Sequence, residues 1–236
     1  MQLRNFILAS AVAMTPGFVS AEPVFDRFGE LPQTEFGGDG IPNDRVAISD
    51  LEFGEFSGVI GITATPRFAN PLPVLIEDGV FGFEPGTNNG TPGQSGDRAK
   101  WNFSFYADVV PVEGINYVLL YDFDPSLGTD YGQLNLEFFV QADSGAIEGS
   151  QNATFTYLND GLPPVAIPPS MFDFDADVNG IYNFRIQALG LQGELLAEAA
   201  IDVIVGDGPT AVPAPAALGL LGIGLLGLGV ARRRRA

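Results

Sequence analysis

The chain has 236 residues, and 29 acidic against 11 basic side chains give it a formal net charge of −18 at pH 7. It contains no cysteine and no histidine, which excludes disulfides, thiolate or imidazole metal sites, and catalysis by either group. The acidic balance repels nucleic acid, while 46% hydrophobic residues favour a packed core over a disordered chain.

The first 21 residues have the three parts of a secretory signal peptide. Arg4 supplies the positive charge, residues 6–14 form a short apolar stretch, and residues 19–21 are small enough for a signal peptidase. We therefore expect cleavage between Ala21 and Glu22, and export of the remaining chain.

Short apolar or alternating runs, bounded by glycine and proline, predict strands throughout residues 22–206. This pattern indicates an all-β fold, a β-sandwich of the immunoglobulin-like or jelly-roll type. We expect it to form one extracellular domain between the cleaved signal peptide and a C-terminal transmembrane helix. The predicted strands are residues 45–48 with 51–56, 58–64, 101–109, 116–121, 134–141, 154–158, 180–189 and 195–205.

Two of these predictions have a specific pattern behind them. Trp101, Phe103, Phe105 and Ala107 alternate with more polar residues and should share one buried face. Residues 180–189 and 194–205 flank a glycine-containing loop, which predicts a hairpin. By contrast, residues 87–96 are rich in Gly, Asn and Thr and should form a loop.

Two acidic loops are candidate cation sites, because Ca²⁺ takes six to eight oxygen ligands in a flexible geometry. The weaker candidate combines Asp122, Asp124 and Asp130, after a predicted strand. Aspartate and asparagine also stabilise ordinary turns through their own side chains, so a plain turn stays open for both loops. The stronger candidate, in which aspartates alternate along one loop, consists of Asp173, Asp175, Asp177 and Asn179.

The C-terminal residues form four consecutive segments: a linker, a proline motif, an apolar span and a basic end. Residues 207–211 form the linker, and residues 216–231 carry no charge. A helix over those 16 residues would be roughly 24 Å long, close to a hydrocarbon core of about 30 Å. The four arginines that follow mark the cytoplasmic side, which places residues 22–211 outside. They are Arg232, Arg233, Arg234 and Arg235.

The order of motif, span and arginine cluster resembles the PEP-CTERM class of sorting signals. Its Val-Pro-x-Pro-Ala form is most similar to the VPLPA-CTERM branch, with Ala214 in place of leucine. The resemblance implies that an exosortase, an integral-membrane cysteine transpeptidase, processes the chain at this motif. It further implies a stay in the inner membrane in transit, then delivery to the cell surface or outside the cell. The matching residues are Val212, Pro213, Pro215 and Ala216.

Three functions fit these observations. The resemblance implies a non-enzymatic cell-surface or extracellular-matrix protein, associated with exopolysaccharide or biofilm. A Ca²⁺- or carbohydrate-binding adhesion module is the second hypothesis. An extracellular carbohydrate-active enzyme is the third, and paired carboxylates would have to perform its chemistry. No cofactor beyond Ca²⁺ and no nucleic-acid partner is expected.

Overall fold

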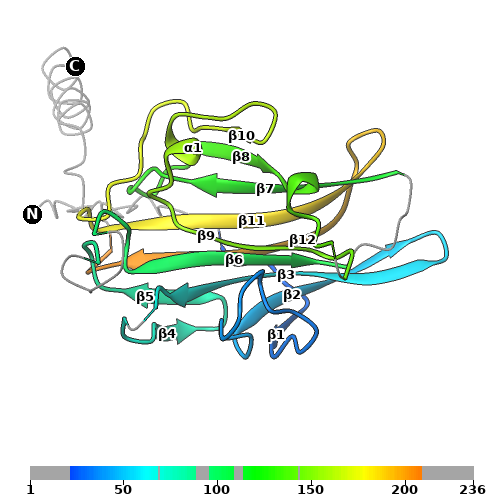
Figure 1. Cartoon of the computed structure of the whole chain (residues 1–236), viewed down its shortest axis with the longest axis horizontal. Coiled ribbons are helices and arrows are strands. Elements are labelled where there is room, and N and C mark those ends of the chain that lie inside the picture. Colours follow the sequence, from blue (N-terminus) through cyan, green and yellow to red (C-terminus); the bar gives the residue numbers. More distant parts are fainter. Residues whose placement is uncertain (1–21, 69, 89–95, 109–113, 143, 209–236) are drawn as a thin grey trace, which may run out of the picture.

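The described part of the chain forms two packed β-sheets with very little helix (Figure 1). The structure is a computed structural model and describes residues 22–68, 70–88, 96–108, 114–142 and 144–208. The mostly β, sandwich-like prediction is confirmed, whereas the finer choice between immunoglobulin-like and jelly-roll types stays a prediction. No helix within these residues has the length and apolar character needed to cross a membrane.

One sheet has five strands, and every neighbouring pair in it is antiparallel. Its second and third strands form a hairpin in which Phe53 lies opposite Phe56. Gly54 closes that turn with a φ of 63°, a left-handed conformation that glycine adopts readily. In spatial order the strands are β1 (Arg27–Gly29), β2 (Val46–Phe53), β3 (Phe56–Pro66), β6 (Trp101–Ala107) and β9 (Ile147–Gln151).

The other sheet has seven strands and is mixed, because β12 and β5 run parallel. The predicted hairpin is confirmed as β11 and β12, paired from Gly180 opposite Val205 to Leu189 opposite Leu195. In spatial order the strands are β10 (Ala166–Ile167), β8 (Tyr131–Asn135), β7 (Ile115–Asp122), β11 (Gly180–Gly190), β12 (Leu195–Val205), β5 (Val80–Phe83) and β4 (Val74–Glu77).

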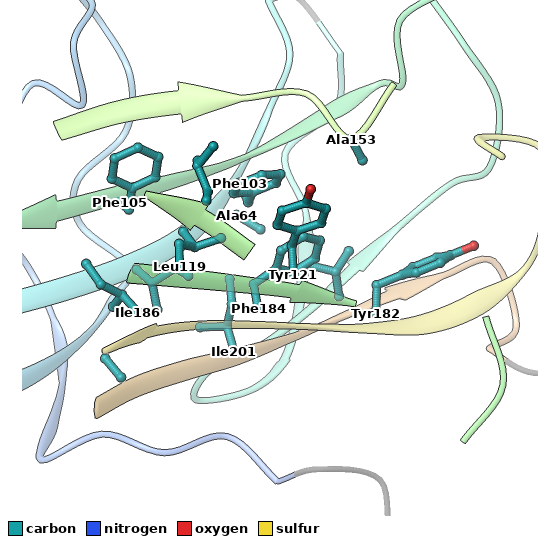
Figure 2. Close-up of a cluster of buried hydrophobic side chains, with 14 of the residues drawn as sticks. Ala64, Phe103, Phe105, Leu119, Tyr121, Ala153, Tyr182, Phe184, Ile186 and Ile201 are labelled. Atoms are coloured by element: carbon teal, nitrogen blue, oxygen red, sulfur yellow. The ribbon is translucent and has the colours of Figure 1, made fainter. Parts of the chain in front are cut away.

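The core between the sheets combines aromatic rings with aliphatic side chains (Figure 2). The alternation in β6 is confirmed, since Trp101, Phe103, Phe105 and Ala107 are all buried. Across the sandwich, the ring of Phe103 stacks on that of Phe184 with centroids 4.6 Å apart. Large rings that meet in this way bury much apolar area and fix the distance between the sheets.

A second, smaller core lies on the outer face of the five-stranded sheet. The long connection between β1 and β2 folds back over this face and buries Leu31 and Phe36 against Val46, Ile48 and Tyr106. The Thr34 hydroxyl fastens the connection to β9 by donating to Glu148 Oε2 at 2.7 Å. This loop therefore replaces solvent over much of the sheet.

The N-terminal residues of the described chain join the two sheets. Val24 forms an antiparallel bridge with Ala200 of β12, with N–O distances of 3.1 and 2.6 Å. The next residues turn to the other sheet, where the amide of Asp26 donates to the Ile48 carbonyl and β1 pairs with β2. Residues 24–29 thus close one side of the sandwich.

Two predicted strands are wrong in whole or in part. Residues 154–158 form no strand. The side-chain oxygen Oδ1 of Asn152 accepts hydrogen bonds from the amide and the hydroxyl of Thr154, and the chain bends there. The short helix α1 (Thr156–Asn159) follows instead. The predicted strand 134–141 ends at Asn135, whose side chain accepts from the Glu137 amide and begins the 3-10 helix η1 (Leu136–Phe139).

Other differences concern strand limits. The predicted segments 45–48 and 51–56 belong to one strand, β2, up to Phe53, and β3 begins at Phe56. Five short strands of two to five residues, β1, β4, β5, β9 and β10, were not predicted. The predicted loop 87–96 lies mostly outside the described residues.

Candidate functional site

The residues predicted to direct sorting lie outside the described part of the chain. This applies to the motif Val212, Pro213, Pro215 and Ala216, and to the arginine cluster 232–235. It also applies to Ala21 on one side of the predicted cleavage site, whereas Glu22 on the other side is described and exposed. The cleavage prediction stays a prediction.

In the first acidic loop, with Asp122, Asp124 and Asp130, carboxylates accept hydrogen bonds from backbone amides. Asp122 is 1% exposed and accepts from the amides of Asp124 and Asp130 at 3.0 and 2.9 Å. Asp130 accepts from the hydroxyl of Ser170 at 2.8 Å and from the amide of Met171 at 2.6 Å, forty residues further on. These bonds join two connections that leave the same end of the seven-stranded sheet.

The environments of Asp122 and Asp130 shift their acidities in opposite directions. Burial raises the pKa of Asp122 to about 6, although the amides of Asp130 and Asp124 work against it. Burial also acts to raise the pKa of Asp130, but the hydrogen bonds from Ser170, Met171 and Phe172 outweigh it. They hold the pKa of Asp130 below its ordinary value. Both carboxyls are engaged with backbone rather than aimed at open space.

The second acidic loop, residues 173–179, is anchored to the core by the aromatic side chain of Phe174. Phe174 packs edge-on against Trp101 with centroids 5.6 Å apart, and its amide donates to Asn159 Oδ1 at 2.7 Å. Asp175 accepts from the amide of Asp177 at 2.9 Å, which is the turn geometry that aspartate favours. Asp173 and Asp177 are exposed.

Neither acidic loop gathers its carboxylates around one point. Over the ranges that the structure describes, no three acidic side chains come close enough together to hold a metal ion. The set Asp173, Asp175, Asp177 and Asn179 therefore remains a predicted calcium site that only a binding measurement can test.

A polar network on the outer face of the seven-stranded sheet was not predicted as a unit. Asn183 is central to it, donating to Asp202 Oδ1 at 2.8 Å and accepting from Tyr131 and Arg185 at 2.7 and 2.8 Å. Arg185 also pairs with Glu198 at 2.8 Å. Burial raises the pKa of Asp202 to about 6, opposed by the Asn183 hydrogen bond and by Arg185. The alternation of Asn183 and Arg185 with core residues along β11 was the available signal.

A row of hollows lies where β3 ends and β6 begins. The middle hollow has a volume of about 450 Å³, and its walls include Arg67, Phe68, Asn70, Asn102 and Ser150. Hollows of about 260 and 470 Å³ adjoin it through shared lining residues such as Leu72. Neither Asp122 nor Asp202 lines any of these three. Sequence patterns did not point here, because the lining residues come from separate loops and strand ends.

Comparison with known proteins bears on the C-terminus alone. Residues 211–235 match the PEP-CTERM protein-sorting motif. No curated protein and no solved structure matches the chain. The matched range includes all of the motif residues and arginines that carried the resemblance, and confirms it. The chain therefore carries a PEP-CTERM protein-sorting motif at its C-terminus, which implies export and sorting to the cell surface by an exosortase.

Proposed function

We propose that this is a non-enzymatic protein of the cell surface or extracellular matrix, associated with exopolysaccharide after an exosortase has processed its tail. The observation that carries the proposal is the match of residues 211–235 to the PEP-CTERM protein-sorting motif. The formal charge of residues 22–211 supports a role in an aqueous outer layer. All 29 acidic residues and only six of the 11 basic ones fall in this stretch, for a formal charge of −23.

The non-enzymatic part of the proposal draws support from the carboxyl groups. A glycosidase sets a carboxyl of raised pKa, its general acid, against a second carboxyl across one sugar-sized space. Glu84 and Asp207 both line the 470 Å³ hollow. Asp122 and Asp202, whose pKa values burial raises, are each tied to neighbouring protein groups and line none of the three hollows. The chain has no histidine or cysteine to replace them.

Changing the two motif prolines tests the sorting role. In the Pro213→Ala, Pro215→Ala variant, the exosortase should no longer recognise the tail, and the protein should stay uncleaved in the inner membrane. Cell fractionation with detection by antibody, in a host that has an exosortase, measures this. We expect at least about a tenfold fall in the released or surface-bound fraction.

The matched control is Pro209→Ala, which removes a proline two residues before the matched range. It should be sorted like the parent protein. Unchanged delivery of the Pro213→Ala, Pro215→Ala variant would show that the motif does not direct sorting. Normal delivery of the parent protein in a host that lacks the exosortase would show that the exosortase is not its processing partner.

A further inference from the structure

The floor of the 450 Å³ hollow is polar and fixed in place. Asn102 donates to the Ser150 hydroxyl at 3.1 Å. Its own side-chain oxygen accepts from Asn152 at 2.8 Å, and Asn152 is fully buried. A fixed amide and hydroxyl beside a cavity are suited to the hydroxyl groups of a sugar, which both donate and accept hydrogen bonds.

One wall of the hollow is an exposed aromatic ring. Phe68 is 62% exposed, although most of the large rings of this protein are buried. Its φ of 53° is left-handed, a conformation that strains a bulky residue by about 1–3 kcal/mol. The Arg67 guanidinium lies over the ring, 4.6 Å from the centroid. The C–H face of a pyranose packs well on such a ring.

The hollow also has an unpaired cation. Arg67 Nε is buried without a hydrogen-bond partner, while Nη1 donates to Asn102 Oδ1 over a long 3.4 Å. Among the described residues Arg67 forms no ion pair, in contrast to Arg27 with Asp50 and Arg185 with Glu198. A buried donor without a partner is costly, so an acceptor from a ligand would be favourable here.

Basic and acidic side chains both gather around this place, because Asp39, Asp44, Glu84 and Asp207 also line the three hollows. Arg45 lines the 260 Å³ hollow and Lys100 the 470 Å³ hollow, both of which adjoin the middle one. Arg98 is near enough to Arg67 to contribute, after burial, to lowering the pKa of Arg67. Lys100 pairs with Glu84 at 3.6 Å and Arg98 with Asp97 at 3.7 Å, whereas no such pair is present for Arg67 among the described residues.

We propose that this hollow, named here the Arg67–Phe68 site, binds a saccharide that carries carboxylates, a uronic acid unit of an acidic polysaccharide. The ring of the sugar would rest on Phe68, its hydroxyls would face Asn102 and Ser150, and its carboxylate would pair with Arg67. The proposal supplies a ligand for the suggested surface role and rests on that role only for its biological setting.

Calorimetric titration of the full chain in mild detergent tests the site. The three probes are oligomers of galacturonic acid, a neutral glucan of equal length, and polyglutamate with the same number of carboxylates. A chelator in the buffer excludes bridging by calcium. We expect binding of the oligogalacturonate alone. Arg67→Gln should weaken it at least about tenfold, the effect of losing a charge-assisted hydrogen bond.

Two more variants separate stacking from charge. Phe68→Ala should also weaken binding roughly tenfold, and Phe68→Tyr should restore it, because the ring is what the sugar face needs. Asp39 lines the hollow and repels a carboxylate, so Asp39→Asn should tighten binding about twofold to fivefold. A merely structural disturbance would not produce a gain of affinity.

Matched controls make the same chemical changes elsewhere. Phe138 is another exposed ring and Arg27 is an exposed arginine, and neither lines the hollow. Phe138→Ala and Arg27→Gln should bind like the parent, and all variants should melt within a few degrees of it. The proposal fails if polyglutamate binds as well as the saccharide, if none of the probes binds, or if Arg67→Gln and Phe68→Ala keep full affinity. Correct sorting with no binding would reject this site alone.

Discussion

Two buried aspartates, Asp122 and Asp202, make the free energy of unfolding of this protein depend on pH. Asp122 and Asp202 are 1% and 6% exposed, and burial raises the pKa of each to about 6. In the unfolded chain an aspartate titrates near pH 4. Between these values the unfolded chain releases its proton first, so these two carboxyls lower the free energy of unfolding as pH rises from about 4 to about 6. Above that range the ionised, buried carboxyls oppose folding.

We expect Asp202→Asn to remove much of this pH dependence. The side-chain oxygen of asparagine can still accept from Asn183 Nδ2, which lies 2.8 Å from Asp202 Oδ1 in the native protein. The variant avoids burying a charge, which should be worth on the order of 1–3 kcal/mol above about pH 7 and nothing near pH 4. Urea unfolding across that pH range measures the difference.

A second variant separates burial from total charge. Glu52 is exposed on β2, and Glu52→Gln removes the same formal charge as Asp202→Asn. It should leave the pH profile parallel to that of the parent. If both variants flatten the profile equally, repulsion over the whole surface is responsible and the burial of Asp202 is not.

Between elements, one side chain connects the end of β9 to the start of β6. Asn152 donates to the carbonyls of Ala99 and Trp101 at 3.0 and 2.8 Å and accepts from the amide of Ala99 at 3.1 Å. Because Asn152 itself is fully buried, water is not at hand to replace these bonds. A residue that lies outside any strand therefore adds side-chain hydrogen bonds to the pairing of β6 with β9.

Replacing this residue should destabilise the fold strongly. Asn152→Ala leaves several buried donors and acceptors without partners, and we expect a loss of about 3 kcal/mol or more in the free energy of unfolding. Equilibrium denaturation measures it, with Asn116→Ala as the control because Asn116 is an exposed residue of β7. A loss below about 1 kcal/mol would mean that the Asn152 bonds are readily replaced.

Sequence patterns predicted the strands whose own residues show a regular alternation or flank a clear turn. The hairpin β11–β12 and the alternation in β6 follow from period two and from a glycine turn, and both are confirmed. Short strands such as β9, Ile147–Gln151, contain too few apolar residues to show a period. They form because β6 offers them a partner, which is a property of the tertiary structure.

The same distinction holds for the two functional sites: one is contiguous in the sequence, and the other is assembled by the fold. The sorting motif is contiguous, so its order of prolines, apolar residues and arginines could be recognised directly. The Arg67–Phe68 site is assembled from two loops and three strands, and Ser150 lies 83 positions after Arg67. Nothing in the composition around Asn102 or Ser150 distinguishes them from other polar strand residues.

For the molecule as a whole, uncompensated negative charge is the dominant electrostatic feature. Among the described residues four ion pairs are present, and only Arg185–Glu198 has both side chains largely shielded from solvent. Most of the 29 acidic groups therefore repel one another across the surface. Salt shortens the range of that repulsion, from about 30 Å at 0.01 M to a few ångströms near 1 M.

We expect the melting temperature to rise by several degrees between about 0.01 M and 0.5 M sodium chloride, because screening relieves the repulsion in the folded state. Differential scanning calorimetry measures it. Magnesium and calcium chloride at equal ionic strength provide the comparison. A stabilisation by calcium well beyond that by magnesium would support a specific site at Asp173, Asp175, Asp177 and Asn179. A melting temperature that is independent of salt would contradict the role of repulsion.

The bridge between Val24 and Ala200 also bears on when the protein can fold. The two residues are 176 positions apart, so the contact that closes the sandwich unites the beginning of the described chain with its last strand. A contact of such separation carries a large loop-closure entropy and forms late. A chain that is exported with its N-terminus first would therefore have to complete its passage as far as β12 before its first residues gain their native partner.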